Sequence, residues 1–216
     1  MRRRTLLAGA AAWPAWAGAD ARALVGAAEA GDMAALRRLL DAGVPVDARD
    51  GRRRTAWLAA TQTNRIDAAR LLIERGADVN AKDEMQDSPF LYAGAEGRLE
   101  ILRMTLAAGA DLKSTNRYGG TALIPAAHHG HVETVRELLK TKIDVDHVNR
   151  LGWTALLEAI ILGDGGAAHT EIVRLLVGHG AKLQRADAQG VTPLAHAEQR
   201  GQRAIAEILR RAGARA

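Results

Sequence analysis

A six-residue pattern, T-A-L-[I/L]-x-A, returns along this chain at a fixed spacing. Four copies follow one another at intervals of 33 residues, another comes after 38, and a degenerate copy lies 33 residues before the first. The copies occupy residues 22–27, 55–60, 88–93, 121–126, 154–159 and 192–197. Such a period indicates a solenoid, in which each unit buries its apolar face against its neighbours. The pattern therefore favours a binding surface over an active site as the functional feature.

Glycine recurs with the same period at two further places in each unit. One set separates two expected helices, and the other ends the second helix, where glycine adopts a left-handed conformation most readily. The first set is Gly31, Gly97, Gly130, Gly163 and Gly201, with Asn64 standing in once, and the second is Gly43, Gly76, Gly109, Gly180 and Gly213. With these residues and the linker Gly-Ala-Asp-Val-Asn-Ala at 76–81, the sequence resembles the ankyrin repeat, a hairpin followed by two helices.

The resemblance implies one all-α-dominated domain, an ankyrin-repeat solenoid of six stacked helix–turn–helix units with short β-hairpin or turn linkers. The implied repeats lie near residues 22–54, 55–87, 88–120, 121–153, 154–191 and 192–214. It also implies a monomer that is not an enzyme and that binds another protein in the concave groove of the array. Two runs, 120–127 and 152–166, are similar to bacterial exported ankyrin proteins, some of which are associated with catalase. That likeness implies an alternative role as an accessory to a periplasmic catalase or other oxidative-stress enzyme.

Several positions depart from the family pattern. Aliphatic residues stand where the signature has its histidine, at Leu58, Leu91, Ile124 and Leu157, which predicts aliphatic packing between repeats instead of Thr–His hydrogen bonds. Lys142 replaces a helix-ending glycine, and we expect a left-handed residue there at a cost of about 1 kcal/mol. Arg53 and Gln86 stand at hairpin positions that are glycine in later repeats.

The same alignment predicts how helices begin and how the array ends. The hydroxyl residues that open the signature are expected N-caps: Thr55, Ser88, Thr121, Thr154 and Thr192. In the last repeat Arg203 and Arg210 take the places of Val132 and Leu139. Because nothing stacks beyond this helix, the substitution predicts a polar terminal cap.

Residues 1–19 have the form of a cleavable signal peptide: a basic start at Arg2–Arg4, a short apolar stretch, and small residues that close A-x-A motifs. The adjacent arginines resemble a twin-arginine signal, and cleavage is expected after Ala17, Ala19 or Ala21, leaving the domain 20–216 in the periplasm without stable membrane anchoring. The apolar stretch is too short for a membrane span. Cleavage after residue 19 removes three arginines and no acidic residue. The remaining 27 basic and 25 acidic residues give a net charge of +2, compared with +5 for the whole chain.

The mature composition narrows the function classes. A net charge this small makes no case for nucleic acid as a partner. There are no cysteines, which excludes disulfides, thiol catalysis and cysteine-bound zinc. The chain also lacks a nucleophile elbow, a phosphate-binding loop and paired carboxylates at a defined spacing. No catalytic residue and no cofactor are therefore predicted.

An apolar patch is the main candidate for partner binding. By resemblance, partners contact the hairpin tips and the ends of the first helices. In repeats four and five these positions are apolar, whereas elsewhere most are polar. The expected patch is Tyr118, Leu151, Trp153, Ile161 and Leu162, bordered by Met85, His128 and His129. Either it is an interface hot spot, or Trp153 folds onto its own hairpin and the two helix-end residues pack under the inserted loop 164–168.

Other candidates carry a structural alternative beside the functional one. Glu158 stands in a row with Tyr92, Pro125 and His196, and it either contacts the partner or is satisfied by a neighbouring group. The histidines at 128, 129 and 131 lack the spacing of a metal motif, so no metal site is predicted. The arginines at 49, 52, 53 and 54 form a basic hairpin, which binds an anionic partner or is simply solvated. The five inserted residues Asp164–Ala168 are expected to lengthen a turn.

Overall fold

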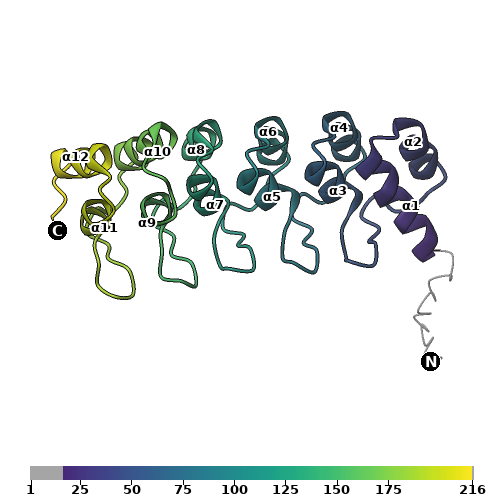
Figure 1. The fold of residues 1–216 in the computed structure, drawn as a ribbon. Helices are drawn as coiled ribbons and strands as arrows, with labels where there is room; N and C mark the ends of the chain where they lie inside the picture. Colours follow the sequence, from purple (N-terminus) through teal and green to yellow (C-terminus); the bar gives the residue numbers. More distant parts are fainter. Residues whose placement is uncertain (1–16, 216) are drawn as a thin grey trace, which may run out of the picture.

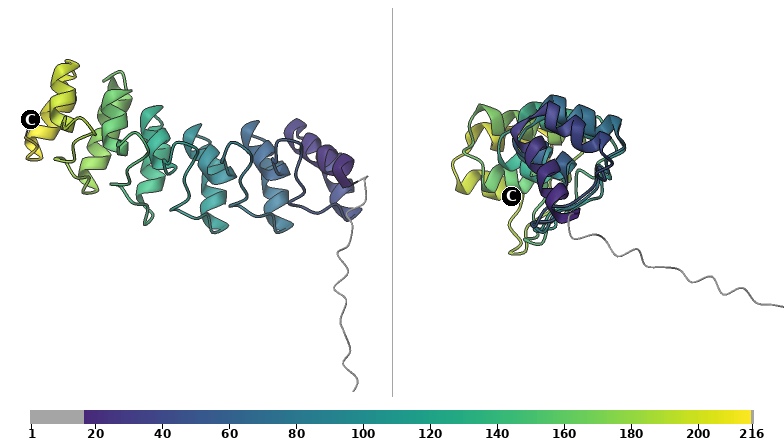
Figure 2. Two further views of the ribbon diagram at one scale, coloured as in Figure 1. Left: turned by 90° about the horizontal axis from the view of Figure 1, so that it is seen from below. Right: turned by 90° about the vertical axis from the view of Figure 1, so that its right-hand side faces the viewer.

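The computed structural model describes residues 17–215, and this part of the chain forms twelve helices and no β-strand. The helices pair into six units that stand in single file, with the first and last units at opposite ends (Figures 1 and 2). The first helices of the pairs are α1 (Ala17–Ala30), α3 (Ala56–Gln62), α5 (Pro89–Ala95), α7 (Leu123–His128), α9 (Ala155–Ile161) and α11 (Pro193–Gln199). The second are α2 (Met33–Asp41), α4 (Ile66–Glu74), α6 (Leu99–Ala107), α8 (Val132–Leu139), α10 (Ala167–Gly178) and α12 (Arg203–Arg211). The predicted six-unit helical solenoid is confirmed.

The first helices form one row beside the loops that join the units, and the second helices form the other row (Figure 1). We call the face made by the first helices and these loops the palm. Each first helix packs between its neighbours, and the positions that carry the family's histidine are aliphatic and buried here. Leu58 and Leu157 are fully buried, and Leu91 and Ile124 nearly so. Burial of these side chains supplies the contact between repeats that the sequence predicts.

Most of the expected hydroxyl caps are present. Thr55, Ser88, Thr154 and Thr192 each accept a hydrogen bond from the backbone N–H three residues on. Thr121 does not: α7 begins after Ala122, and the buried Thr121 hydroxyl has no hydrogen-bond partner. The reason is Pro125, whose equivalents in the other repeats donate a backbone N–H to the carbonyl of the cap residue. Proline has no N–H, so the Thr121 carbonyl instead accepts from Ile124 N at 3.2 Å, and the first turn is displaced.

The loops between units share one geometry without forming strands. Each begins with Asp or Asn, whose side-chain oxygen accepts the backbone N–H groups of the third and fifth loop residues at 2.8 to 3.0 Å. These loops span 50–54, 83–87, 116–120, 149–153 and 187–191. The fourth residue of each has positive φ, which is an ordinary conformation for glycine but a strained one for Arg53 (60°) and Gln86 (63°). The turn form of the expected linkers is therefore the one observed.

The two strained loop residues give a stability prediction. We expect Arg53→Gly and Gln86→Gly each to raise the free energy of unfolding by about 0.5–1 kcal/mol, because the left-handed strain relieved exceeds the extra unfolded-state entropy of glycine. Urea denaturation of each variant measures the change. Arg52→Gly is the matched control, since position 52 has no positive φ and the substitution should lower stability. A loss of stability in all three variants would contradict the strain.

Lys142 is not left-handed, so the expected strain at this position is wrong. The non-glycine residues of positive φ within 17–215 are Arg53, Asn64 and Gln86. Here α8 ends at Leu139, and the hydroxyl of Thr141 donates to the carbonyl of Leu138 at 2.6 Å while accepting from Ile143 N at 3.2 Å. These side-chain bonds satisfy the end of the helix, so no residue has to turn left-handed.

The five inserted residues do more than lengthen a turn. The left-handed residue between α9 and α10 is Gly165, with φ 70°, and not Gly163, the glycine that the alignment places between these helices. Because α10 begins at Ala167, the insertion also extends the start of that helix. His169 nevertheless keeps the place expected for it, since its Nε2 donates to the carbonyl of His128 in the preceding unit at 2.8 Å.

The ends of the array differ from its middle. In α12, Arg203 and Arg210 are exposed, and Arg210 pairs with Glu198 at 2.6 Å, which confirms the polar cap. At the other end α1 begins at Ala17, and Ala21 is buried. The basic start and the apolar stretch of the expected signal peptide lie outside the described residues. Within 17–215 no helix combines the length and apolar character that crossing a membrane requires.

Candidate functional site

A groove of about 510 Å³ runs across the palm over repeats three to five. It is bounded by α5, α7 and α9, by the residues that cap these helices, and by the loops 83–87, 116–120 and 149–153. Six of the predicted partner-binding residues line it, namely Tyr118, His128, His129, Leu151, Glu158 and Leu162. We call this site the palm groove. A groove formed by several loops on a rigid array is a common setting for recognition.

Apolar side chains project from the loop tips that border the palm groove. The third residue of the loop is Met85, Tyr118 and Leu151 in three consecutive units, and these side chains are 44%, 55% and 53% exposed. In the outer units the same position is polar, at Arg52 and Gln189. An exposed apolar row restricted to the central repeats is typical of an interface and not of a solvated surface.

Tyr118 is the aromatic member of the row. Its ring lies under the guanidinium of Arg117, whose central carbon is 4.8 Å from the ring centroid. The backbone N–H of Tyr118 is held by the Asn116 side chain at 2.9 Å, so the tip is positioned without burying the ring. A positioned but exposed aromatic ring is the usual anchor of a protein interface.

Glu158 lines the groove from α9 and is 7% exposed. Its Oε1 accepts a hydrogen bond from Asn149 Nδ2 at 2.7 Å, and Asn149 in turn accepts from the backbone of its own loop. The Oε2 atom lies 3.9 Å from His128 Nδ1, which is too long for a hydrogen bond. Burial raises the pKa of Glu158, and the hydrogen bond from Asn149 opposes that rise. The carboxylate is therefore held in place, but only one of its two oxygens accepts a hydrogen bond from residues 17–215.

Asp87 lies at the other end of the groove, in the loop before α5. Among residues 17–215 its carboxylate has no ion pair and no hydrogen-bond donor. Burial first, and the nearby charge of Asp83 second, raise its pKa to about 6. Arg117 and Lys82 act in the opposite sense and Glu96 in the same sense. Asp87 lies outside the predicted partner-binding set, because its burial depends on the neighbouring unit.

The raised pKa of Asp87 predicts that removing its charge stabilises the folded protein, and that this stabilisation depends on pH. The folded pKa of about 6 exceeds the ordinary 3.8, so the folded state loses stability as pH rises between these values. We expect Asp87→Asn to raise the free energy of unfolding at pH 7.5 by about 1 kcal/mol, after discounting for partial solvent screening. At pH 4 the two proteins should be equally stable. Urea denaturation at both pH values measures this, with the exposed Glu84→Gln as control; an equal effect of Asp87→Asn at both pH values would contradict it.

Two histidines line the groove, and they are held differently. His129 Nδ1 donates to the carbonyl of Ala95 in the preceding unit at 2.7 Å. Burial lowers the pKa of His128, as do His129 and His169, which favours its neutral ring. No group of three or more His, Asp or Glu side chains within 17–215 is placed to hold a metal ion.

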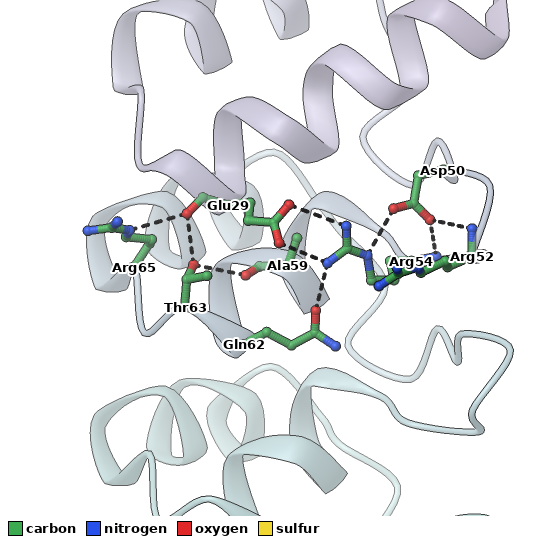
Figure 3. A network of polar contacts seen from close by, with 8 residues as sticks. All are labelled: Glu29, Asp50, Arg52, Arg54, Ala59, Gln62, Thr63 and Arg65. Carbon is green, nitrogen blue, oxygen red and sulfur yellow. Dashed lines mark hydrogen bonds and ion pairs between the residues drawn. The ribbon is translucent and has the colours of Figure 1, made fainter.

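On the N-terminal side of the groove, polar side chains of the palm pair with one another. Arg54, from the loop of repeat two, donates to both oxygens of Glu29 on α1, to Asp50 Oδ2 and to Gln62 (Figure 3). Its side chain is 15% exposed, and these contacts raise its pKa. Arg49 likewise donates to the carbonyl of Lys82. Two of the four arginines in the basic hairpin, Arg49 and Arg54, therefore hold repeats together. That leaves Arg52 and Arg53 for an anionic partner.

Polar side chains of the palm also pair with each other on the C-terminal side. His196 Nε2 donates to Asp187 Oδ2 at 2.7 Å, and both groups are nearly buried. This pair joins the first loop residue to the fifth signature residue, the same relation that joins Asn149 to Glu158. The palm groove thus lies between two stretches of the palm whose polar side chains are paired within the chain.

Three of the predicted partner-binding residues do not line the groove. Met85 is exposed at the next loop tip, and Trp153 and Ile161 are half-buried. Of the fifth-position row, Tyr92, Pro125 and Glu158 line the groove, whereas His196 is paired elsewhere. The groove residues outside the predicted partner-binding set include Asp87, Glu96, Arg117 and Asn149. The recurrence of Asp or Asn nine residues before the fifth signature position is the signal that could have found Asn149.

A family model and a curated protein both match this chain as ankyrin repeats. The sequence model of the family described as ankyrin repeats (3 copies) matches residues 9–83 and 90–185. Among curated proteins, the ankyrin repeat protein YahD of Escherichia coli K12 is 49% identical over 57 residues. That match covers 26% of this chain and 28% of YahD.

Solved structures match most of the chain. An ankyrin repeat domain from Acinetobacter baumannii AYE has 58% sequence identity and a TM-score of 0.86, over 89% of this chain and 98% of that one. The ankyrin repeat protein EF0377 has 41% identity and a TM-score of 0.84, over 88% and 97%. The ankyrin repeat domain of Bcl-3, a member of the IkappaB family, has 29% identity and a TM-score of 0.80, over 89% and 86%.

Proposed function

Because this chain belongs to the ankyrin repeat proteins, whose repeats are protein–protein interaction modules and generally not enzymes, we propose that it captures another protein in the palm groove. The observation that supports this most is the coincidence of the groove with the exposed apolar row at Met85, Tyr118 and Leu151. The polar side chains on either side, by contrast, already pair within the chain. An aromatic anchor with a polar rim is the composition expected of a binding hot spot.

Co-purification tests this proposal. Full-length protein is isolated from its own cells beside two variants with the same change at the same loop position, Leu151→Lys and Gln189→Lys. Both sites are exposed, so both variants should melt like the wild type. We expect a stoichiometric protein partner with the wild type and with Gln189→Lys, but not with Leu151→Lys, because a buried unpaired charge opposes docking. Equal recovery with both variants would place the interface elsewhere.

We also propose that this capture takes place in the periplasm after cleavage of the N-terminal signal. The support is the sequence pattern of residues 1–19. Cleavage after Ala17 or Ala19 is favoured over cleavage after Ala21, because Ala21 is 4% exposed and packs in the core. Cell fractionation and the intact mass of the mature protein test both points. A cytoplasmic protein of uncleaved mass would contradict export.

An accessory role beside a periplasmic catalase or other oxidative-stress enzyme is the second possibility, and it rests on sequence resemblance alone. The co-purification experiment distinguishes it, because a haem enzyme would be the captured partner. Turnover of a substrate by the purified chain itself would contradict a purely binding function.

A further inference from the structure

We propose that the palm groove selects a partner segment that carries a Lys or Arg side chain, whose cation binds Glu158 Oε2. This inference rests on the proposed function and adds the chemistry of the partner. The occupant is an extended protein segment in which the basic residue has an apolar neighbour that covers Leu151 and Leu162.

The first argument is the half-satisfied carboxylate. Glu158 is 7% exposed, and only its Oε1 has a hydrogen bond, from Asn149 at 2.7 Å. The Oε2 atom lies 3.9 Å from His128 Nδ1, and burial favours the neutral form of that ring. A buried carboxylate without a cation is costly. A cation from the partner would satisfy the atom that the chain itself leaves without a hydrogen bond.

The second argument is the contrast with the other units. On the same face, the carboxylates of Asp187 and Glu29 are each paired with a cationic or donor side chain of the chain, His196 and Arg54 respectively. Repeat five has the same scaffold, but an amide stands opposite the carboxylate of Glu158. Within residues 17–215 the chain therefore supplies the acid and the hydrogen-bond donor that orients it, and it places no lysine or arginine beside the acid.

The third argument is the charge of the groove as a whole. Its lining holds three carboxylates, Asp87, Glu96 and Glu158, against one guanidinium, Arg117. The mature chain has the opposite sign overall, so the negative groove is a local feature that favours a cationic segment. The apolar neighbour of the Lys or Arg would pack on Leu151 and Leu162 while the charged end of the basic side chain reaches Glu158.

The test uses a display library of random 12-residue peptides, selected on the immobilised full-length protein. We expect the selected peptides to be enriched in Lys or Arg beside an apolar residue. Affinities are then measured for the wild type, for Glu158→Gln, which can still accept the bond from Asn149, and for the control Glu133→Gln on the outer face of α8. Glu158→Gln should weaken binding about tenfold or more, as removal of one partner of a close charge pair does. Glu133→Gln should have no effect.

A double-mutant cycle completes the test. Replacing the basic peptide residue with Met should weaken binding to the wild type but not to Glu158→Gln. Peptides without basic enrichment, or peptides that bind Glu158→Gln as tightly as the wild type, would overturn cation recognition. If such peptides were still weakened by Tyr118→Ala, docking in the groove would stand. A library that yields no binder sensitive to either substitution would overturn both.

Discussion

Gly163→Ala is expected to lower the free energy of unfolding by about 3 kcal/mol, the upper end of the usual cost of overpacking a close-packed site. A Cβ added at this position would lie 2.1 Å from the carbonyl oxygen of Ala159 and 2.5 Å from His169 Cδ2. The carbonyl belongs to the last turn of α9, so it cannot move without breaking helical structure. The His169 ring cannot move freely either, because it bonds to the preceding unit.

Gly178→Ala is the matched control. This glycine is the last residue of α10, and a Cβ added there meets no atom within 4 Å. Alanine should therefore leave stability unchanged or raise it by up to about 1 kcal/mol. Urea denaturation of the full chain measures both variants. Similar stabilities would show that the turn after α9 is loose and that the inserted segment does not fix it.

Tyr118→Ala has the largest effect that we expect on binding. The ring is 55% exposed in the free protein, so its removal should leave the melting temperature nearly unchanged. Truncating a central aromatic anchor costs about 2 kcal/mol or more of binding free energy, which corresponds to about 30-fold weaker capture. Calorimetric titration of the co-purified partner measures the affinity.

Gln189→Ala serves as the control for this variant, since it truncates the same loop position in repeat six, outside the groove. It should bind as the wild type does. A Tyr118→Ala protein that binds normally, or one that loses binding only because it unfolds, would contradict the role of Tyr118 as an aromatic anchor.

The fold is predictable because the repeat is local and periodic. The hydroxyl of Thr154 and the aliphatic Leu157 repeat at a fixed spacing, and each has the same physical role in every unit. The failures occur where one repeat departs from the others. Pro125 abolishes the cap at Thr121 by lacking an N–H, and Thr141 ends α8 without a left-handed residue, so Lys142 is not strained.

The groove is less predictable than the fold. The exposed tips Tyr118 and Leu151 follow from sequence, because an apolar residue in a loop has no packing partner within its own unit. The states of Glu158 and Asp87 do not, because burial and pairing depend on residues in adjacent units. The sequence therefore does not show whether a polar group already has a partner within the chain. That pairing decides which polar groups of the palm remain available to another protein.

Photocrosslinking in intact cells tests the location of the interface most directly. A photoreactive amino acid is placed at position 151 in the groove, and in separate strains at positions 52 and 189, which hold the same place in the outer loops. The proposed capture predicts one protein joined to position 151 and no comparable product from 52 or 189. The same protein crosslinked equally from all three positions, or captured only from the outer two, would contradict it.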